Sequence, residues 1–393
     1  MLNNMEAAPA ISIINSLIAD AVKIKASDIH LETLADRLRV RFRVDGVLSE
    51  VASFPPNIQH NLISRVKIMS ELDIAERRKP QDGRLQFAGN KNLDIRVSSV
   101  PTIYGEKLVL RILDKQAVSL SIQELGFSSD NLGYVQAFCQ HANGMVLATG
   151  PTGSGKTTTL HSMLTELNSP EKNIVTIEDP VEYRLYGVNQ IQVNTKSGLS
   201  FADGLRSILR QDPNIIMVGE IRDKETAEIA IRAALTGHLV LSSLHTNDAV
   251  GALPRLLDMG VEPFLVCSSI IGVVAQRLVR RICDECKQEY RPERNCTQDI
   301  FLKKHGFMQE YTLYRGHGCP SCSHSGYRGR IAIQEVLCIT PQMRAAVMGG
   351  CNSNDILAIA QTNRFESMSK DGIKKSLAGI TTIEEVIRIA YSF

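Results

Sequence analysis

Gly150-Pro-Thr-Gly-Ser-Gly-Lys156-Thr157-Thr158 matches the phosphate-binding loop pattern G-x-x-x-x-G-K-[ST] without a mismatch. An apolar run of strand type precedes this loop at residues 145–149. A helical pattern follows it, with apolar side chains in phase at Leu160, Met163, Leu164 and Leu167. Glycines let a backbone close around phosphates, and a helix N-terminus turns free N–H groups and its positive dipole end toward them. The strand–loop–helix context predicts a nucleotide phosphate site.

Residues of this loop have distinct expected roles. Lys156 is expected to reach the β- and γ-phosphates, and the Thr157 hydroxyl is expected to hold Mg²⁺. A chance glycine-rich turn is the alternative, which the complete pattern in this context disfavours. The predicted nucleotide-binding set is Gly150, Pro151, Thr152, Gly153, Ser154, Gly155, Lys156, Thr157 and Thr158.

Length and composition limit the class of protein. At about 150 residues per domain, a chain of 393 residues is expected to hold two or three domains. A net charge of +2 provides no global field, so no nucleic-acid partner is expected. No apolar run reaches the roughly 18 residues of a membrane span, and the N-terminus lacks the features of a secretory signal. Nine cysteines without such a signal indicate a reducing compartment, with thiols free or metal-bound.

Residues 1–115 have the pattern of a mixed α+β unit. Arginines alternate with apolar residues over 37–44, which predicts a strand with one charged face, and Asp45-Gly46 predicts a hairpin turn. We interpret the charged face as solvated, with an anion or partner surface as the alternative. Further expected elements are helices at 9–24 and 57–75, a turn at 80–84, strands at 85–87, 93–97 and 108–113, and a linker at 116–123.

The rest of the chain divides into three regions. Strand and helix patterns alternate over residues 124–275, which predicts an α/β fold with a parallel sheet of βαβ units. Residues 276–330 are rich in Cys, Gly, Arg and Lys with little periodicity, which is typical of a compact, loop-rich module. Residues 331–393 have helical periodicity.

A phosphate-binding loop needs an acidic partner at the end of a neighbouring strand, and two candidates follow it. One strand pattern ends in three carboxylates, among them Glu178 and Glu182, and a second, at 214–220, ends in Glu220. Glu220 has the Walker B position, where a carboxylate holds Mg²⁺ through its water shell. A carboxylate of the first segment would orient or deprotonate the attacking water. Taken singly, each carboxylate is also compatible with a helix cap or a surface charge.

Two histidines, His238 and His245, flank an apolar strand pattern. A histidine at a strand end near the γ-phosphate could sense that phosphate or carry a catalytic proton. Either histidine alone would be interpreted as structural, but their place after the Walker B segment favours a functional role.

Two cysteine pairs, Cys283/Cys286 and Cys319/Cys322, have C-x-x-C spacing and are separated by residues 287–318. Together they provide the four soft ligands of a closed, tetrahedral structural Zn²⁺ site, which implies scaffolding rather than metal catalysis. The spacer is longer than usual, but closure entropy grows slowly with loop length. A redox dithiol would explain one pair but not two. The alternative ligands are His317 and His324.

Phosphoryl transfer also needs cations on the charge that spreads over the phosphoryl oxygens. Each arginine taken singly would be interpreted as a surface residue or an ion-pair partner. The candidates are Arg96, Arg111, Arg206, Arg210 and Arg222.

Together these motifs resemble the secretion ATPase superfamily, with its Walker A, Asp box, Walker B and His box at 150–158, 176–183, 205–223 and 236–247. The cysteine pairs are similar to those of type II secretion ATPases and type IV pilus assembly ATPases, whereas pilus retraction ATPases resemble the core but lack them. Residues 26–32 and 41–46 resemble the family's N-terminal PAS-like domain. The resemblance covers nearly the whole chain. It implies a PAS-like domain at 1–115, a RecA-like ATPase core at 124–275, a zinc module at 276–330 and a helical C-terminal subdomain at 331–393.

The resemblance also implies a mechanism and partners. ATP, Mg²⁺ and Zn²⁺ are the expected cofactors, and a homohexamer is expected to drive an inner-membrane platform protein that builds a pilus or pseudopilus. The chain would be cytoplasmic and peripheral at the inner membrane. Members usually carry a further N-terminal docking domain. Since the PAS-like match begins almost at residue 1, we do not expect that domain in this sequence, and a cytoplasmic docking partner stays an open expectation.

Individual roles carry over with the resemblance. They are Lys156 and Thr157 for phosphate and Mg²⁺, Glu220 for the Walker B acid, Glu182 and then Glu178 for the attacking water, His238 and His245 for the His box, and Arg96 and Arg111 for arginine fingers, with Arg206, Arg210 and Arg222 as weaker candidates.

Two other functions stay open at this level. A DNA-uptake or conjugation motor would also combine a phosphate loop with a zinc module, but it predicts a basic patch, which the near-neutral charge disfavours. A nucleotide-binding scaffold without hydrolysis would be favoured by the loss of Lys156 or of the acidic partners, and all of these are present.

Overall fold

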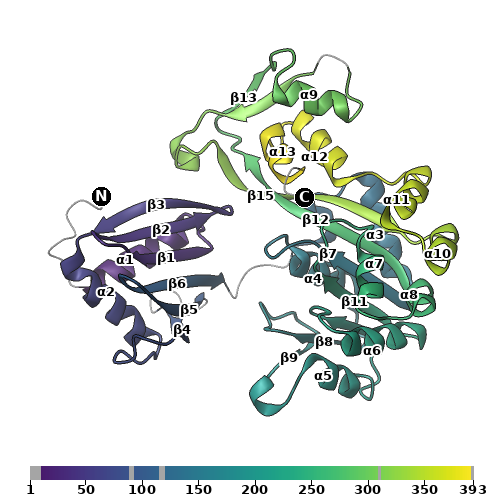
Figure 1. Ribbon diagram of the computed structural model, residues 1–393, viewed down its shortest axis with the longest axis horizontal. Coiled ribbons are helices and arrows are strands. Elements are labelled where there is room, and N and C mark those ends of the chain that lie inside the picture. Colours follow the sequence, from purple (N-terminus) through teal and green to yellow (C-terminus); the bar gives the residue numbers. More distant parts are fainter. Residues whose placement is uncertain (1–9, 88–92, 115–119, 309–310, 391–393) are drawn as a thin grey trace. The chain divides into compact units, whose positions relative to one another are not determined.

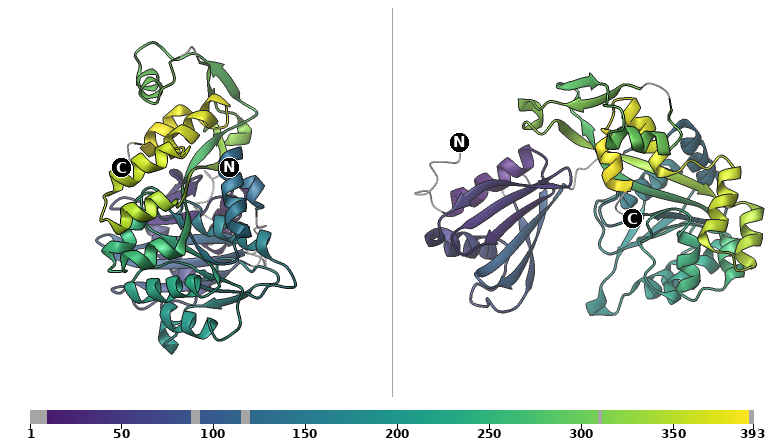
Figure 2. Two further views of the ribbon diagram at one scale, coloured as in Figure 1. Left: turned by 90° about the vertical axis from the view of Figure 1, so that its right-hand side faces the viewer. Right: turned by 45° about the horizontal axis from the view of Figure 1, so that its top comes forward.

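The computed structural model describes residues 10–87, 93–114, 120–308 and 311–390. The chain divides into two compact units, Met1–Ala117 and Val118–Phe393, drawn in Figure 1 and Figure 2. No helix among the described residues is long and apolar enough to span a bilayer.

The first unit is an antiparallel sheet with two helices packed on its apolar face. The strand order is β3-β2-β1-β6-β5-β4. Alternate side chains of the strands, such as Val40 and Ile95, form one buried cluster with Ile14 and Val66 of the helices. The elements are α1 Ala10–Lys23, β1 Asp28–Thr33, β2 Leu38–Val44, β3 Val47–Phe54, α2 Pro56–Met69, β4 Gln81–Gln86, β5 Leu93–Thr102 and β6 Gly105–Asp114.

One predicted hairpin of this unit is confirmed and one predicted turn is wrong. Asp45-Gly46 joins β2 to β3, and Gly46 has the positive φ of +85° that such a turn favours. Residues 81–84 lie in β4 instead of a turn, and Gly83 pairs with Val97 of β5. A Cβ on Gly83 would lie 2.3 Å from the Ser70 carbonyl oxygen, so the glycine serves a close backbone approach.

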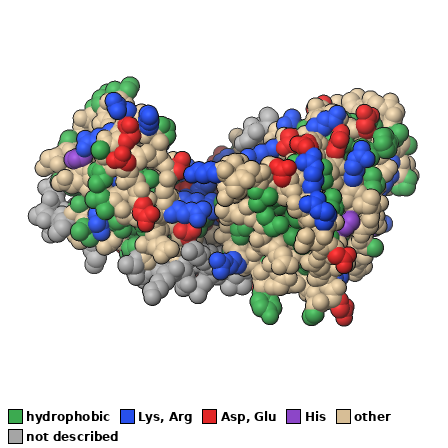
Figure 3. Space-filling model, turned by 90° about the horizontal axis from the view of Figure 1, so that it is seen from below, with side chains coloured by type: hydrophobic (Ala, Val, Ile, Leu, Met, Phe, Trp, Pro, Cys, Tyr) green, Lys and Arg blue, Asp and Glu red, His purple; other side chains and the backbone are tan. Residues whose placement is uncertain are grey.

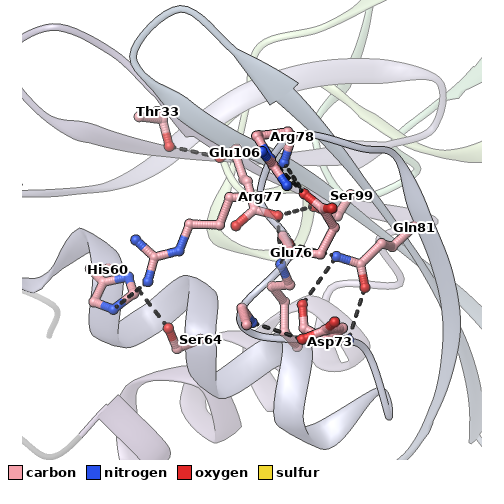
Figure 4. A network of polar contacts seen from close by, with 12 residues as sticks. Thr33, His60, Ser64, Asp73, Glu76, Arg77, Arg78, Gln81, Ser99 and Glu106 are labelled. Carbon is pink, nitrogen blue, oxygen red and sulfur yellow. Dashed lines mark hydrogen bonds and ion pairs between the residues drawn. The ribbon is translucent and has the colours of Figure 1, made fainter.

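A buried cation holds the loop between α2 and β4. Lys67 of α2 is 1% exposed, and its Nζ donates to the Glu106 carboxylate at 2.8 Å and to the Glu76 carbonyl oxygen at 2.6 Å. Ser99 donates to the same Glu106 oxygen at 2.9 Å, and Gln81 donates to the same Glu76 carbonyl at 2.8 Å. These bonds, several of which are drawn in Figure 4, join the irregular segment between α2 and β4 to a hydrogen-bond network with members on α2, β4, β5 and β6.

The second unit is built on a mostly parallel sheet with helices on both faces, which confirms the predicted α/β architecture. The order is β15-β12-β7-β11-β10-β8-β9, and only the β12–β15 pairing is antiparallel. In β7, Met145 and Leu147 face a cluster with α5, α6 and α8, whereas Val146 and Ala148 face a cluster with α3 and α4. The elements are η1 Ile122–Leu125, α3 Ser129–Gln140, β7 Gly144–Thr149, α4 Lys156–Leu167, β8 Ile174–Glu178, β9 Asn189–Gln192, η2 Thr195–Ser197, α5 Phe201–Ile208, β10 Ile215–Val218, α6 Lys224–Leu235, β11 Leu239–Leu244, α7 Ala252–Asp258, α8 Pro263–Ser269, β12 Ile270–Ile282 and β15 Tyr327–Cys338.

Two predicted boundaries fall inside strands of this sheet. The boundary at 275/276 lies within β12, and the region expected to be helical from 331 begins in β15. The reason is that β12 and β15 form one long ladder, paired from Gly272↔Cys338 to Ile282↔Tyr327, which continues the core sheet into the cysteine-rich segment. The remaining elements are β13 Lys287–Tyr290, α9 Thr297–Lys304, β14 Leu313–Gly316, η3 Pro320–Cys322, α10 Pro341–Met348, α11 Ser353–Thr362, α12 Met368–Leu377 and α13 Ile383–Ala390.

The buried Lys67–Glu106 pair gives a stability prediction. Lys67→Met removes one partner and leaves a buried carboxylate without its cation, so the free energy of unfolding should fall by about 3 kcal/mol. Urea denaturation of the full chain, followed by circular dichroism, measures the change. As the control, Arg78→Ala on the same loop breaks only the exposed contact with Glu76 and should leave the unfolding curve unchanged. Equal stability of Lys67→Met and wild type would contradict the role of the pair.

Candidate active site and metal centre

The phosphate loop runs from the end of β7 at Thr149 to the start of α4 at Lys156. Gly150 has a φ of +144°, and a Cβ on it would lie 2.5 Å from the Gln276 carbonyl oxygen. Gly155 precedes α4 in the left-handed region, with a φ of +91°. Because both positions need glycine, the sequence produces a loop that curls back over the first turn of α4 and leaves its N–H groups inward.

Lys156 lies inside this loop. Its Nζ donates to the carbonyl oxygens of Gly150 at 2.7 Å and Pro151 at 3.2 Å. Burial lowers the pKa of Lys156, and the nearby Glu220 carboxylate opposes this shift. Thr157, next along α4, is exposed. A buried ammonium, an exposed hydroxyl and a carboxylate around helix N–H groups form a donor set that fits a Mg²⁺-bound nucleotide phosphate.

Gln276 of β12 fastens the loop, and no motif in the sequence pointed to it. Its Oε1 accepts from the Thr159 hydroxyl at 2.7 Å, and its Nε2 donates to the Ser154 carbonyl at 2.8 Å. Gln276 is 1% exposed. A polar side chain that directly follows the apolar run 270–275 was the available signal for such a role.

Glu220 and His245 meet at the same edge of the sheet as the phosphate loop. Glu220 follows β10 and His245 follows β11, and His245 Nε2 lies 3.1 Å from Glu220 Oε2. Arg222 forms an ion pair with Glu220 and lies 3.8 Å from the Asp179 carboxylate. Since β7, β10 and β11 are parallel, their carboxyl ends bring these groups together.

The two carboxylates predicted to handle the attacking water are placed differently. Glu178 is buried at the end of β8, where it accepts from His161 at 3.1 Å, Thr176 at 2.8 Å and Gln190 at 2.9 Å. Burial alone would raise the pKa of Glu178, but these hydrogen bonds outweigh it and leave the pKa below its ordinary value. Glu182 is exposed in the loop that follows. Of the two, Glu178 is enclosed by donors of its own unit and Glu182 is open to solvent.

The structure does not bring His238 to the phosphate loop. His238 precedes β11, and its Nδ1 lies 3.0 Å from the Ala233 carbonyl oxygen at the end of α6. β11 runs from Leu239 to Leu244, so His238 and His245 lie roughly 20 Å apart on opposite edges of the sheet. The structure thus places His245, and not His238, beside Glu220.

Among the arginines of the second unit, Arg222 alone of the three predicted ones contacts Glu220 or the phosphate loop in the described residues. Arg206 is engaged by Glu225 and, at 3.6 Å, by Asp203. Arg210 donates to the Arg206 carbonyl at 2.9 Å. Both residues lie at the end of α5, away from the carboxyl edge of the sheet.

Arg96 and Arg111 belong to the first unit. They oppose each other on β5 and β6 and share one face of that sheet. Arg111 is 61% exposed and donates to Asp28 at 3.1 Å. The arginines of β2 occupy the same face, and Arg41 pairs with Glu32 at 2.7 Å. Hydrogen bonds from these cations outweigh burial and lower the pKa of Glu32 to about 2, so the charged face is an ion-pair network rather than a row of solvated arginines.

The four predicted metal ligands come together between the ends of β12 and β15. The sulfur atoms of Cys283, Cys286, Cys319 and Cys322 all lie within 4.8 Å of one another. Burial opposes ionisation of Cys322, but backbone N–H groups at 3.1 and 3.3 Å outweigh it and lower its pKa to about 6. Burial raises the pKa of Cys286 to about 11. Four thiolates in contact need a cation, and this soft, closed donor set fits Zn²⁺.

The histidine alternatives do not join the cluster of described metal-ligating atoms. The His317 Nε2 contacts the Gln288 side chain instead. His324 has a φ of +60° in the turn after Cys322. The four-cysteine set is therefore the one that the geometry supports.

Gln276→Ala should weaken nucleotide binding about tenfold, because two hydrogen bonds that shape the phosphate loop are lost. Titration with a fluorescent ADP analogue measures the Kd. Gln334→Ala is the matched control, since Gln334 is a buried glutamine opposite Gln276 in the ladder that does not touch the loop. An unchanged Kd for Gln276→Ala would show that the loop holds its shape without this side chain.

The cysteine cluster predicts about one Zn per chain in reduced, purified protein, measured by elemental analysis. Cys319→Ser should release the metal and speed proteolysis of residues 283–326, because the metal no longer joins the two cysteine pairs. Cys338→Ser, outside the cluster, should retain it. Folded, reduced wild-type protein that holds no zinc would refute the assignment.

The chain is similar to known proteins over nearly its whole length. A family model described as "Type II/IV secretion system protein" matches residues 3–388. "Type II secretion system protein E" of Dickeya dadantii strain 3937 is 49% identical over 390 residues, which cover 99% of this chain and 77% of the relative. "Type IV pilus assembly ATPase PilB" of Myxococcus xanthus strain DK1622 is 47% identical, with 97% and 68% covered. The crystal structure of the pilus retraction motor PilT with bound ADP matches with a TM-score of 0.63 at 27% identity, covering 96% of each chain. The chain belongs to the Type II/IV secretion system protein family.

Proposed function

We propose that this chain is a Mg²⁺-dependent ATPase that powers pseudopilus or pilus assembly in type II secretion or type IV pilus biogenesis. The observation that carries the proposal is the meeting of Lys156, Glu220 and His245 at one sheet edge, in a chain whose relatives are named for these systems. The chain would act as a homohexamer at the cytoplasmic face of the inner membrane, on a platform protein of the machine.

The residues at this edge divide the work of phosphoryl transfer. The loop N–H groups and Lys156 would bind the β- and γ-phosphates, and Thr157 and Glu220 would hold Mg²⁺, which when bound would supply positive charge to the phosphoryl oxygens. His245 orients the Glu220 carboxylate through the 3.1 Å contact. Exposed Glu182 is the first choice to orient the attacking water, because Glu178 already accepts three hydrogen bonds.

An arginine finger from a neighbouring subunit would complete the site. Arg222 contacts Glu220 within the chain, Arg206 on α5 is paired with Glu225, and Arg210 donates back to Arg206 from the turn after that helix. Arg96 and Arg111 lie side by side on the charged face of a separate unit, which suits presentation to nucleotide in another copy of the chain. Activity that depends on assembly follows from this arrangement.

A DNA-uptake or conjugation motor is the alternative within the same superfamily. Its DNA-binding surface would need a continuous basic stripe. On the face drawn in Figure 3, Lys and Arg side chains are interspersed with Asp and Glu, consistent with the net charge of +2. The secretion or pilus motor is therefore preferred.

ATPase rate against protein concentration, with light scattering in parallel, tests the proposal. Specific activity should rise as hexamers form, and Glu220→Gln should reduce kcat at least about 100-fold, because it removes the negative charge that would hold Mg²⁺ at the phosphates. Glu228→Gln, which alters only a contact with Lys224 on α6, is the matched control and should retain full activity. Activity of a monomer that does not change with concentration would contradict a site shared between subunits.

A further inference from the structure

The loop that follows β11, residues 245–249, touches both sides of the candidate active site. His245 contacts Glu220, and the hydroxyls of Thr246 and Thr149 lie 2.5 Å apart. Thr149 is the residue that precedes the phosphate loop, and its Oγ1 accepts from the Thr246 N–H at 3.0 Å. A shift of either the phosphate loop or Glu220 therefore displaces this loop.

A buried carboxylate connects the same loop to the C-terminal helices. Glu335 of β15 is 5% exposed. Its Oε1 accepts from the Ala249 N–H at 2.7 Å, and its Oε2 accepts from the N–H of Met368, the first residue of α12, at 2.9 Å. Each oxygen thus holds one backbone amide, and the two amides belong to segments far apart in the chain. We propose that Glu335 is a positioning residue that couples the nucleotide-dependent position of loop 245–249 to α12. This rests on the proposed function for the nucleotide.

Charge chemistry makes the link adjustable. Burial raises the pKa of Glu335 to about 7, the Ala249 and Met368 amides oppose that shift, and the Asp248 carboxylate adds to it. The charged groups on the surrounding elements include Arg277 of β12, which lies on the same face of the ladder and donates to Asn247 of the loop at 3.1 Å, and the Asp371–Lys375 pair of α12. Lys370 and Lys374 also belong to α12, and Lys374 pairs with Glu366.

The sign follows from the raised pKa. Because the folded-state pKa lies above the ordinary 4.5, the contribution of Glu335 to stability is greatest below pH 4.5 and declines as pH rises through about 7. The coupling behaves in the opposite way. Protonation turns one oxygen into a hydroxyl, which is a weaker acceptor than a carboxylate oxygen, so the bond to one of the two amides weakens. Coupling is therefore complete above pH 7 and weakens below it.

Hydrogen exchange of the full chain with and without Mg²⁺–ADP tests the proposal. In wild type at pH 8, ADP should slow exchange in the peptides that contain Ala249 and Met368. In Glu335→Gln, ADP should slow exchange only in the peptide that contains Ala249. The glutamine side chain accepts from one N–H but presents its own NH₂ donor to the other. The matched control is Asp371→Asn, which alters another buried carboxylate of α12 that accepts from Gln334 and Lys375 but not from the loop. It should keep the ADP effect at both peptides.

Kinetics provides the second readout. Glu335→Gln should lower kcat on the order of tenfold, with the KM for ATP within about twofold, and should flatten the rise of kcat between pH 6 and pH 8. ADP-dependent protection at Met368 that persists in Glu335→Gln would overturn the proposal. If Glu335→Gln does not fold, the wild-type protein provides the test. ADP-dependent protection factors at Met368 that are equal at pH 6 and pH 8 would then overturn the proposal. Absence of hydrolysis would count against the proposed function alone, because the exchange experiment requires only ADP binding.

Discussion

Parallel pairing of β7, β11, β10 and β8 is the constraint on which the second unit depends. Thr149 pairs with Leu244, Val218 pairs with Ser242, and the strands end within a few residues of one level. The segments that leave them, which start at residues 150, 179, 219 and 245, therefore emerge at one edge although they are far apart in the chain. Reversal of any one strand would move its functional group to the far edge, as the place of His238 illustrates.

Strand β12 connects the parallel part of the sheet to the cysteine-rich segment. It is parallel to β7, where Gln276 holds the phosphate loop, and antiparallel to β15 along a ladder that ends next to Cys283. A single 13-residue strand thus carries a contact of the nucleotide site and a ligand of the metal cluster. From Gln276 onward β12 pairs with β15, so one two-stranded ladder connects the phosphate-loop contact to the cysteine cluster.

The predictable part of this molecule is the part whose chemistry depends on adjacent residues. The phosphate loop and the cysteine pairs place their functional atoms by local spacing, so the sequence contained their geometry. Glu220 and His245 needed one further inference, that parallel strands end at a common edge. The same inference would have separated His238 from His245, because the six residues of β11 lie between them.

Gln276 and Glu335 could not be predicted in this way. Each is a buried polar residue in a strand that also carries other polar residues, and its partners lie on segments more than 30 residues away: Ser154 and Thr159 for Gln276, Ala249 and Met368 for Glu335. The turn predicted at Gly83 was wrong for a related reason. Its pattern is that of a turn, and only the nearness of the Ser70 carbonyl shows that the glycine is needed for packing.

Three buried carboxylates fasten the C-terminal helices to the β12–β15 ladder, and they differ in one respect. Asp371 has the Lys375 ammonium at 2.7 Å, and Glu385 has the Arg280 guanidinium at 2.8 Å, which helps lower the pKa of Glu385 to about 2. Glu335 accepts from two backbone amides instead. The arginine keeps Glu385 ionised as a fixed anchor, whereas burial raises the pKa of Asp371 in spite of Lys375 and raises the pKa of Glu335 to about 7. If fastening were the whole requirement, a third ion pair would meet it. Glu335 differs from both because its two oxygens hold amides of separate segments, so a change at this one carboxylate reaches the site loop and α12 together.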